Sequence, residues 1–298
     1  MRIEYLKYFN EVAATRSISK VANNFHISQP ALSQQIQKLE EMLGHKLLIR
    51  SNKGVELTEA GHIVEKYARN LIKAYDNMLE DLEEVSKNHS TIRIDSVLTL
   101  GTYALPCTLY NVKEKYPEIS FSLTTNTCED VERNVLNGVC DIGFIYGRPE
   151  EKTLHYTKVG VDKLVVIATE DYPIQQDINL KELLTHRLIM LQEKFRQRKE
   201  LNSYLRNLGY SIDGCNVFLC LDSTESVKSA VIKGYGLSIV PYISVKKELY
   251  TKQLKQIQIV DFDMSYDIYL IYRKDKYTSS NVKNFINYLK QIGEKSFC

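Results

Sequence analysis

Uncharged amide and hydroxyl side chains recur at helical spacing between Ser28 and Gly44, and this residue type suits hydrogen bonding to nucleic-acid bases. At 100° per residue, one face of a helix would carry Pro30, Ser33, Gln34 and Gln37, with Gln29 on its flank. Glutamine can form two hydrogen bonds with an adenine edge, and serine accepts or donates as required. The pattern predicts a base-contacting face. The alternative is an ordinary helical hairpin with a solvated polar side.

Capping residues and an apolar stripe predict the two helices that would position this face. Ser17 or Ser19 can cap a first helix, and His26 and Ile27 would form the turn. Ser28 then caps a second helix, which Gly44 ends. The buried side of the second helix is predicted from apolar residues at spacings of four, three and four, namely Leu32, Ile36, Leu39 and Leu43.

The segment after Gly44 is typical of a two-stranded wing, with a turn at 52–54 and a second strand ending at Thr58. Lys46, Arg50 and Lys53 could contact phosphates or a narrow minor groove. The predicted DNA-binding residues of the helix and wing are Gln29, Pro30, Ser33, Gln34, Gln37, Lys38, Arg50 and Lys53.

Residues 5–61 closely resemble the amino-terminal domain of LysR-type transcriptional regulators. The resemblance is carried by F9, A13, S17, A22, the run SQPALSQQIQKLE, LG, L47, R50 and the run LTEAG. Two positions depart from the family pattern. Leu48 stands where the family usually has Phe, which exchanges one core residue for another. Asn52 stands where the family often has a basic residue, which removes one expected phosphate contact.

A long helix is predicted from Thr58, which can cap it, to the hinge-like stretch at 86–91. A helix of roughly 30 residues would span about 45 Å. Apolar residues at alternating spacings of four and three form a coiled-coil seam, consisting of Val64, Ala68, Leu71, Tyr75, Met78, Leu82 and Val85. We expect this seam to dimerise the chain. Packing against its own domain is the alternative. A further helix over 3–14 would brace the helical pair.

Composition places the chain among soluble globular proteins, with 298 residues, 44% hydrophobic and 26% charged. The net charge is only +2, but bases outnumber acids in residues 1–57 and acids dominate 58–90. DNA binding would therefore depend on local patches. No segment resembles a signal peptide or a membrane helix. The six cysteines form no C-x-x-C pair, and no histidine has metal-ligand spacing, so we expect reduced thiols, a cytoplasmic location and no metal.

From Thr91 onward, alternating strands and helices predict a parallel α/β sheet. The resemblance to the family extends here through residues 137–144, 225–241 and 269–275. It implies a small-molecule-sensing domain of two lobes, similar to bacterial solute-binding proteins, with the chain leaving the first lobe and later returning. The expected fold is thus a multidomain α+β protein. Its predicted parts are a winged helix-turn-helix at 1–57, a linker helix at 58–90, and an effector-binding domain at 91–298, with lobe one at 91–161 and 267–298 and lobe two at 162–266.

Small polar residues follow three predicted strands, at the end of a sheet where α/β proteins bind ligands. They are Thr99, Gly101 and Thr102; Asn126, Thr127 and Cys128; and Ser223 and Thr224. Each could simply cap a helix. The resemblance implies that they converge on one cleft, where free N–H groups would favour an oxyanion. Arg148 could add a charge, or pair with Glu150 at the surface. Gln192 could face the cleft, and Pro241 borders it by resemblance.

Three functions follow as alternatives. The first is a transcriptional regulator that binds double-stranded DNA and is controlled by a small, anionic metabolite. It would act as a homodimer, the resemblance implies a homotetramer through additional pairing of the sensing domains, and no cofactor is expected. The second is a thiol-based redox sensor of the same architecture, in which Cys128, Cys215 and Cys220 are the candidates. The third is a solute-binding protein or an enzyme, for which no catalytic constellation is found.

Overall fold

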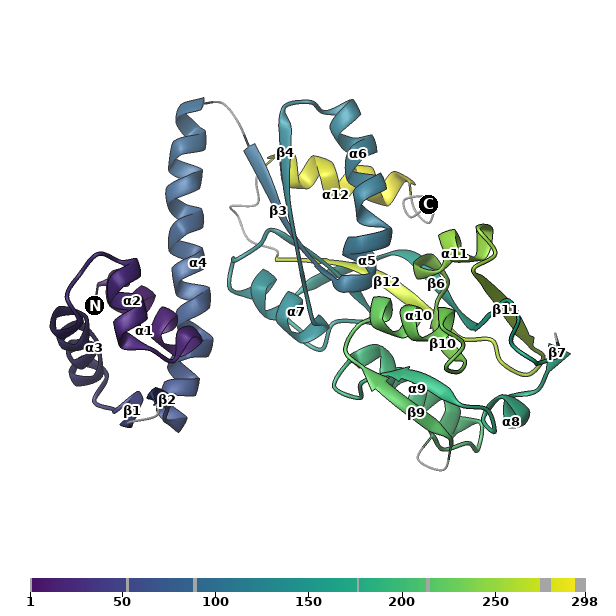
Figure 1. Cartoon of the computed structure of the whole chain (residues 1–298). Helices are drawn as coiled ribbons and strands as arrows, with labels where there is room; N and C mark the ends of the chain where they lie inside the picture. The colour runs from purple at the N-terminus through teal and green to yellow at the C-terminus, as the bar shows by residue number, and fades with distance from the viewer. Residues whose placement is uncertain are drawn as a thin grey trace. The chain divides into compact units, whose positions relative to one another are not determined.

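The computed structural model describes residues 2–51, 54–87, 90–175, 177–212, 215–273 and 280–292 (Figure 1). The chain divides into two compact units, Met1–Asn88 and His89–Cys298. The first unit therefore contains both the predicted winged domain and the predicted linker helix.

The first unit begins with three short helices and a hairpin. They are α1 (Ile3–Thr15), α2 (Ile18–Asn24), α3 (Gln29–Leu43), β1 (Leu48–Ser51) and β2 (Gly54–Leu57). Ser17 accepts a hydrogen bond from Lys20 N and caps α2, and Ser28 caps α3 in the same way through Ala31 N. Gly44 ends α3 in the left-handed conformation, with φ of 71°. These sequence predictions are confirmed, because each cap satisfies N–H or C=O groups that a helix end leaves open.

Helix α4 (Glu59–Lys87) completes the core of this unit. Thr58 caps it by accepting from Gly61 N at 2.9 Å, and donates to Lys46 O at 2.7 Å. Ala68 is 1% exposed within the core formed by α1, α2, α3 and the wing, and Val64 and Ile72 pack against the same core. A Cβ at Gly61 would lie 2.2 Å from Leu47 O, so only glycine allows this close approach of helix and wing.

The second unit alternates strands and helices. Its first part consists of β3 (Ser90–Val97), α5 (Leu98–Tyr103), α6 (Leu105–Lys115), β4 (Ile119–Asn126), α7 (Cys128–Leu136), β5 (Ile142–Tyr146) and β6 (His155–Thr169). The next part consists of β7 (Asp177–Ile178), α8 (Leu180–Leu183), β8 (Leu188–Leu191), α9 (Arg196–Asn207), β9 (Val217–Leu221), α10 (Thr224–Ile232) and β10 (Ser238–Pro241). The last elements are η2 (Tyr242–Ser244), α11 (Lys246–Tyr250), β11 (Leu254–Ile259), β12 (Ser265–Tyr272) and α12 (Ser280–Ile292).

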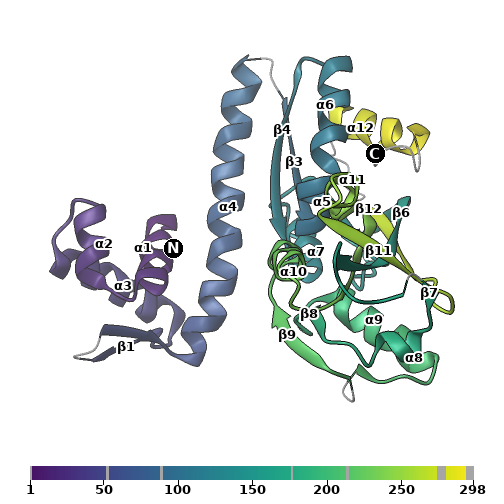
Figure 2. The same ribbon diagram turned by 45° about the vertical axis from the view of Figure 1, so that its right-hand side comes forward.

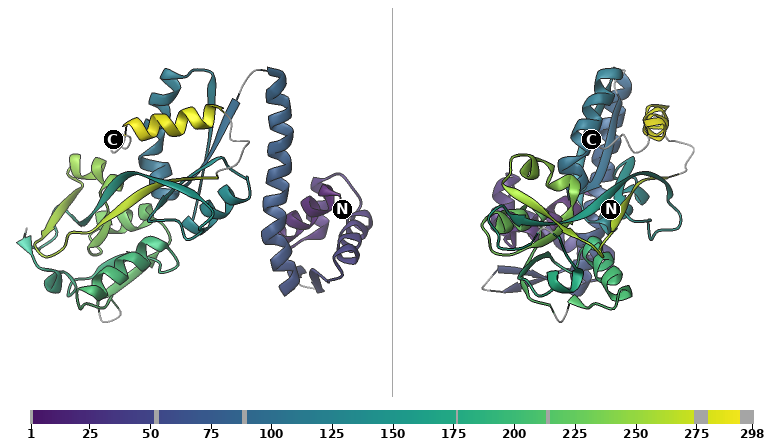
Figure 3. Two further views of the ribbon diagram at one scale, coloured as in Figure 1. Left: turned by 180° about the vertical axis from the view of Figure 1, so that it is seen from behind. Right: turned by 90° about the vertical axis from the view of Figure 1, so that its right-hand side faces the viewer.

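One long strand, β6, joins the two lobes of this unit (Figure 2). Its first half pairs with β12 between residues 155 and 163, beside β5, β3 and β4 of lobe one. Its second half pairs with β10 and β11 in lobe two. The lobe boundary predicted between residues 161 and 162 therefore falls inside a continuous strand. Helix α12 returns to pack on lobe one, where Val282, Phe285 and Leu289 are buried (Figure 3).

The helix after β3 differs from the prediction. Thr99, Gly101 and Thr102 were predicted to follow the strand, at the start of the next helix or just before it. Instead α5 begins at Leu98, and Ala104 separates it from α6. The break has a physical cause, because Pro106 near the start of α6 lacks the N–H that would continue a helix.

Among the residues that the structure describes, no helix is long and apolar enough to cross a membrane. Within those same residues, no group of His, Cys, Asp and Glu side chains could hold a metal ion.

Candidate functional site

The predicted base-contacting face lies on the exposed side of α3. Gln29, Pro30, Gln34, Gln37 and Lys38 are exposed, and Ser33 is half-buried. Arg50 Nη1 donates to Ser33 Oγ at 3.4 Å, so the first strand of the wing lies beside this face. Lys53 lies outside the described residues.

A buried carboxylate holds the wing against α3. Glu40 is 6% exposed and accepts hydrogen bonds from Leu47 N at 2.8 Å, Leu48 N at 3.2 Å and Lys46 Nζ at 2.7 Å. Burial by itself would raise the pKa of Glu40, but these three donors outweigh it and lower the pKa below its usual value. Leu48, the position that departs from the family pattern, is buried in the core as expected.

The exposed apolar stripe on α4 begins one residue earlier than predicted. Ala68 is buried in the core of its own unit, so it is not available to a partner helix, and Val64 is partly buried there. This is a correction to the predicted seam, and it arises because the first turns of α4 are needed to cover α1. The exposed apolar residues are Ile63, Tyr67, Leu71, Met78, Leu79 and Leu82. Tyr75 is half-buried, and the side chain of Val85 lies outside the described residues.

In the second unit, the amino termini of α7 and α10 open onto one narrow cavity of about 30 Å³. Thr127 and Ser223 cap these helices by accepting from Asp130 N and Ser226 N, so the capping alternative holds for both. The predicted ligand residues that do converge here are Thr99, Asn126, Thr127, Cys128, Ser223 and Thr224. Asn126 is held in place because its Nδ2 donates to both carboxylate oxygens of Asp95.

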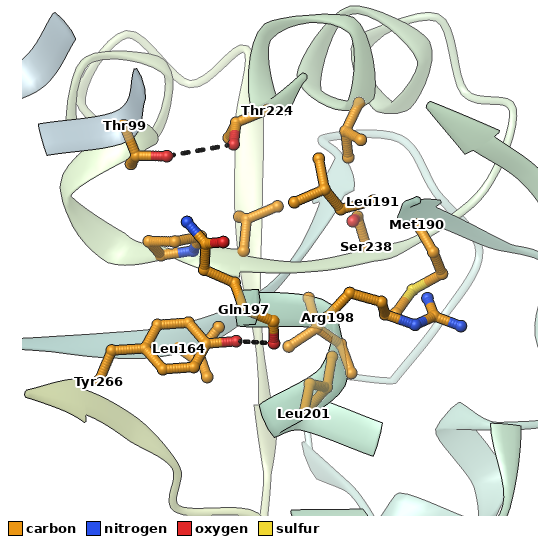
Figure 4. A pocket seen from close by; sticks show the side chains of 14 residues that line it. Thr99, Leu164, Met190, Leu191, Gln197, Arg198, Leu201, Thr224, Ser238 and Tyr266 are labelled. Atoms are coloured by element: carbon orange, nitrogen blue, oxygen red, sulfur yellow. Dashed lines mark hydrogen bonds between the residues drawn. The ribbon is translucent and has the colours of Figure 1, made fainter. Parts of the chain in front are cut away.

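The two lobes meet across this cavity through two hydroxyl groups. Thr99 Oγ1 of α5 lies 3.4 Å from Thr224 Oγ1 of α10 (Figure 4). Hydroxyl hydrogen bonds are usually 2.7–2.8 Å long, so this contact is weak.

Arg196, which sequence reasoning missed, is a buried cation beside these helix termini. It lines the same cavity and its side chain is only 7% exposed. Its Nη1 lies 2.7 Å from Glu132 Oε1, and its Nη2 lies 3.6 Å from Glu150 Oε1. The ion pair joins α9 in lobe two to α7 in lobe one. Glu132 is fixed in turn, because its Oε2 accepts from Glu150 N at 2.8 Å and Glu151 N at 3.0 Å.

Four other predicted ligand residues lie elsewhere. Arg148 is exposed and its Nε donates to Tyr269 Oη at 3.4 Å, away from the cavity. Thr102 is exposed, and Gly101 is buried where a Cβ would lie 2.5 Å from Thr125 Cγ2, so its role is close packing. Gln192 does not line the cavity. A fifth residue, Pro241, lines an adjoining cavity.

Two buried cysteines of the second unit, Cys128 and Cys140, lack the character of redox sensors, whereas Cys215 is partly exposed and Cys220 is exposed. Cys128 is 2% exposed, and burial raises the pKa of its thiol to about 12. Burial also raises the pKa of Cys140 well above its usual value. Reactive thiols need a lowered pKa and access to solvent.

A buried carboxyl group on β6 connects the two lobes. Asp162 is 4% exposed, accepts from Tyr146 Oη at 2.7 Å in lobe one, and accepts from Ile243 N at 3.2 Å in lobe two. Burial raises the pKa of Asp162 from 3.8 to about 6, although both donors oppose the shift.

Replacing Asp162 with Asn should change how stability depends on pH. A carboxyl group whose folded-state pKa is raised stabilises the fold fully below its unfolded pKa, and this contribution is lost as pH rises through about 6. Asn stays neutral at every pH. At pH 8, the free energy of unfolding of D162N should therefore exceed that of the parent by up to roughly 3 kcal/mol. The difference should shrink below pH 5. Urea titrations at several pH values measure it, and a pH-independent difference would contradict the assignment.

A winged helix-turn-helix, a long helix and a two-lobed domain with a cleft are together typical of a transcriptional regulator. The chain belongs to the LysR family, since residues 86–293 match the LysR substrate binding domain and residues 3–62 match the bacterial regulatory helix-turn-helix protein of the lysR family. It is a regulator and not an enzyme. The fold class expected from the sequence is confirmed. The predicted parallel sheet is in fact mixed, because β6 pairs antiparallel with β10, β11 and β12.

Curated relatives match along almost the whole chain. The probable RuBisCO transcriptional regulator of Emiliania huxleyi is 28% identical over 97% of this chain and 94% of its own length. The HTH-type transcriptional activator CmpR of Synechocystis is 27% identical, covering 96% and 94%. Among solved structures, the LysR family regulator CbnR superposes with a TM-score of 0.81 at 21% identity, covering 98% and 99%. The regulatory domain of Synechocystis CcmR in complex with 2-PG superposes with a TM-score of 0.62 at 24% identity, covering 69% and 98%.

Proposed function

We propose that the chain binds double-stranded DNA as a dimer through α3 and the wing, and that a small anion bound between the lobes controls this binding. The relatives support both parts: CbnR has been solved with its target DNA, and the CcmR regulatory domain with 2-PG. A regulator that binds DNA would work in the cytoplasm.

The DNA part is supported by the chemistry of one surface. Gln29, Gln34 and Gln37 are exposed amides on α3, and Arg50 extends from the wing toward Ser33. Amides discriminate bases by paired hydrogen bonds, whereas a guanidinium beside them reaches phosphate or the minor groove. The surface therefore combines a specific and a non-specific contact.

Two substitutions separate these contacts. A target sequence is first selected from random duplexes with the full chain, and binding is then measured by gel shift over a range of salt. Gln34→Ala should weaken binding to the selected sequence by about 1–3 kcal/mol while leaving weak binding to random DNA unchanged. Arg50→Ala should weaken both and reduce the salt slope by about 1. If neither variant changes binding, α3 and the wing are not the DNA surface.

Dimerisation is supported by the exposed stripe on α4, in which Leu71 is 50% exposed and Leu82 is 63% exposed. Leu71→Glu would place a charge in the seam between two such helices, where its burial is unfavourable. Sedimentation equilibrium should then show a dimer affinity that is lower by at least about tenfold. The control is Lys73→Glu on the opposite side of α4, which should leave the dimer intact. Equal effects of the two would contradict pairing through this stripe.

The anion part is supported most strongly by Arg196, a buried guanidinium that lines the same cavity as the amino termini of α7 and α10. Helix termini attract anions through free N–H groups and the helix dipole, and arginine binds carboxylate or phosphate with paired hydrogen bonds. An anion there would compete with Glu132 for Arg196. It would thereby change the contact between α9 and α7, and with it the closure of the lobes.

A thermal-shift screen of the full chain tests this part. Small carboxylates and phosphate esters, 2-PG among them, are compared with their neutral amide or alcohol analogues at constant ionic strength. Some anions should raise the melting temperature, and their neutral analogues should not. A neutral analogue that stabilises as well as its parent anion would exclude charge as the basis of recognition.

A further inference from the structure

Two of the exposed amides on α3 are held by neighbouring side chains. Ser19 Oγ on α2 donates to Gln29 Oε1 at 2.9 Å. Gln37 Nε2 donates to Glu41 Oε1, one turn further along α3, also at 2.9 Å. The two neighbours differ in chemistry, because a hydroxyl can donate or accept, whereas an ionised carboxylate can only accept. The contacts therefore constrain the two amides differently.

Glu41 extends the predicted base-contacting face by one turn. At 100° per residue it lies about 20° around the helix from Pro30, and it follows Gln37 by four residues, the spacing at which side chains on a helix meet. Glu41 and Gln37 are both exposed. An acid on a surface that meets DNA is repelled by the phosphates. Attraction to the DNA backbone therefore does not explain a glutamate here.

The carboxylate of Glu41 determines how the amide of Gln37 is turned. Because Glu41 can only accept, the NH2 group of Gln37 must face it, and the opposite orientation would bring two acceptor oxygens together. The carbonyl Oε1 of Gln37 and the second N–H of its NH2 group are then left for the duplex. Ser19 imposes no such choice on Gln29, since the hydroxyl can bond either end of that amide.

The chemistry of the bases converts this orientation into a preference. In the major groove, adenine and cytosine each present an amino group that donates a hydrogen bond, whereas guanine and thymine present carbonyl oxygens that accept. An outward Oε1 of Gln37 accepts from an amino group and is repelled by a carbonyl oxygen. Adenine fits best, because its N7 can also accept from the second N–H of Gln37.

We propose that Glu41 determines base specificity by holding Gln37 so that it selects an amino base, adenine before cytosine. Glu41 is a positioning residue, and Gln37 makes the contact. This inference rests on the proposed DNA surface of α3 and the wing, and it adds the class of base that one side chain of that surface selects.

Three substitutions test the inference by gel shift on the sequence selected with the full chain. Gln37→Ala locates the base pair that Gln37 reads, as the position where the preference disappears. There, on one strand, the parent should bind A and C more tightly than G and T, by roughly 5- to 150-fold. Glu41→Gln should lower this preference, since an amide can bond either end of Gln37. Glu41→Lys should reverse it, because an ammonium only donates and turns the carbonyl of Gln37 inward.

A charge control and an internal control accompany these variants. Glu11→Lys on α1 makes the same change of charge at another exposed glutamate and should leave the preference unchanged. Glu41→Lys should also leave unchanged the preference at the base pair read by Gln34. The lysine should not disturb the fold, because a cation suits the last turn of a helix.

The outcomes separate this inference from the proposed DNA surface. If Glu41→Lys retains the order of bases seen with the parent, or if Gln37→Ala alters no position, the inference fails. Weaker binding by Gln34→Ala and Arg50→Ala would still support the surface in either case. If those two variants bind as the parent does, the proposed surface fails first.

Discussion

Arg196→Met should both destabilise the second unit and abolish its response to anions. The substitution leaves Glu132 as a buried carboxylate, 6% exposed, without its cation. Removing one partner of a buried pair costs about 3–5 kcal/mol. For a unit of this size, we expect the melting temperature to fall by roughly 6–20 °C. Calorimetry of the full chain, with and without anion, measures both effects.

A second substitution separates stability from recognition. Glu132→Gln in the Arg196→Met background removes the uncompensated charge, and the amide oxygen can still accept from Glu150 N and Glu151 N. Most of the lost stability should return, but the anion response should not, because the guanidinium is still missing. Return of the response in the double variant would show that Arg196 is only structural.

The matched control is Arg133→Met on α7. Arg133 Nη1 pairs with Asp130 at 2.7 Å, but the two side chains are 34% and 42% exposed. Exposed pairs contribute about 0–1 kcal/mol. R133M should therefore leave both the melting temperature and the anion response nearly unchanged.

Glu40→Ala should disable the first unit. The change leaves the N–H groups of Leu47 and Leu48 without an acceptor in a buried place, and each unsatisfied group costs about 1–3 kcal/mol. We expect a loss of roughly 3–5 kcal/mol in unfolding free energy, together with loss of DNA binding as β1 leaves α3. Urea unfolding and gel shift measure the two effects.

The neighbouring residue provides the control for Glu40. Glu41 is exposed, and its side chain accepts a hydrogen bond from the exposed amide of Gln37 at 2.9 Å. Glu41→Ala should cost less than about 0.5 kcal/mol. Because the pKa of Glu40 is lowered, its contribution should be present above its unfolded pKa and be lost as pH falls through its folded pKa. Equal effects of E40A and E41A would contradict a special role for Glu40.

Local patterns predicted the first unit well. Leu32, Ile36 and Leu39 of the predicted stripe are fully buried, and Ser17, Ser28 and Thr58 cap the helices that they precede. Leu43 was predicted to belong to the same buried stripe but is 38% exposed, at the last residue of α3. These signals lie within a few residues of the structure they specify. The prediction of the α4 seam was less accurate at Val64 and Ala68. Periodicity identifies an apolar face of a helix, but it does not show which partner covers each turn.

The cleft was predicted where small polar residues follow a strand. Thr127 and Ser223 were found because a small polar residue at a strand–helix junction is a local signal. Arg196 was missed because its partners, Glu132 and Glu150, are distant in sequence. An arginine at the start of a helix is also usually predicted to be exposed. The adjoining cavity was missed because its lining is equally scattered in sequence, since β6, β10, α9 and α10 all contribute to it.

The way α4 completes the first core decides where this protein can be cut and rejoined. A fragment ending at residue 57 would lack Val64, Ala68 and Ile72, and would expose the apolar side of α1 that they cover. Hybrid regulators that exchange sensing domains should therefore be joined after α4, so that the transferred winged domain keeps the whole of that helix.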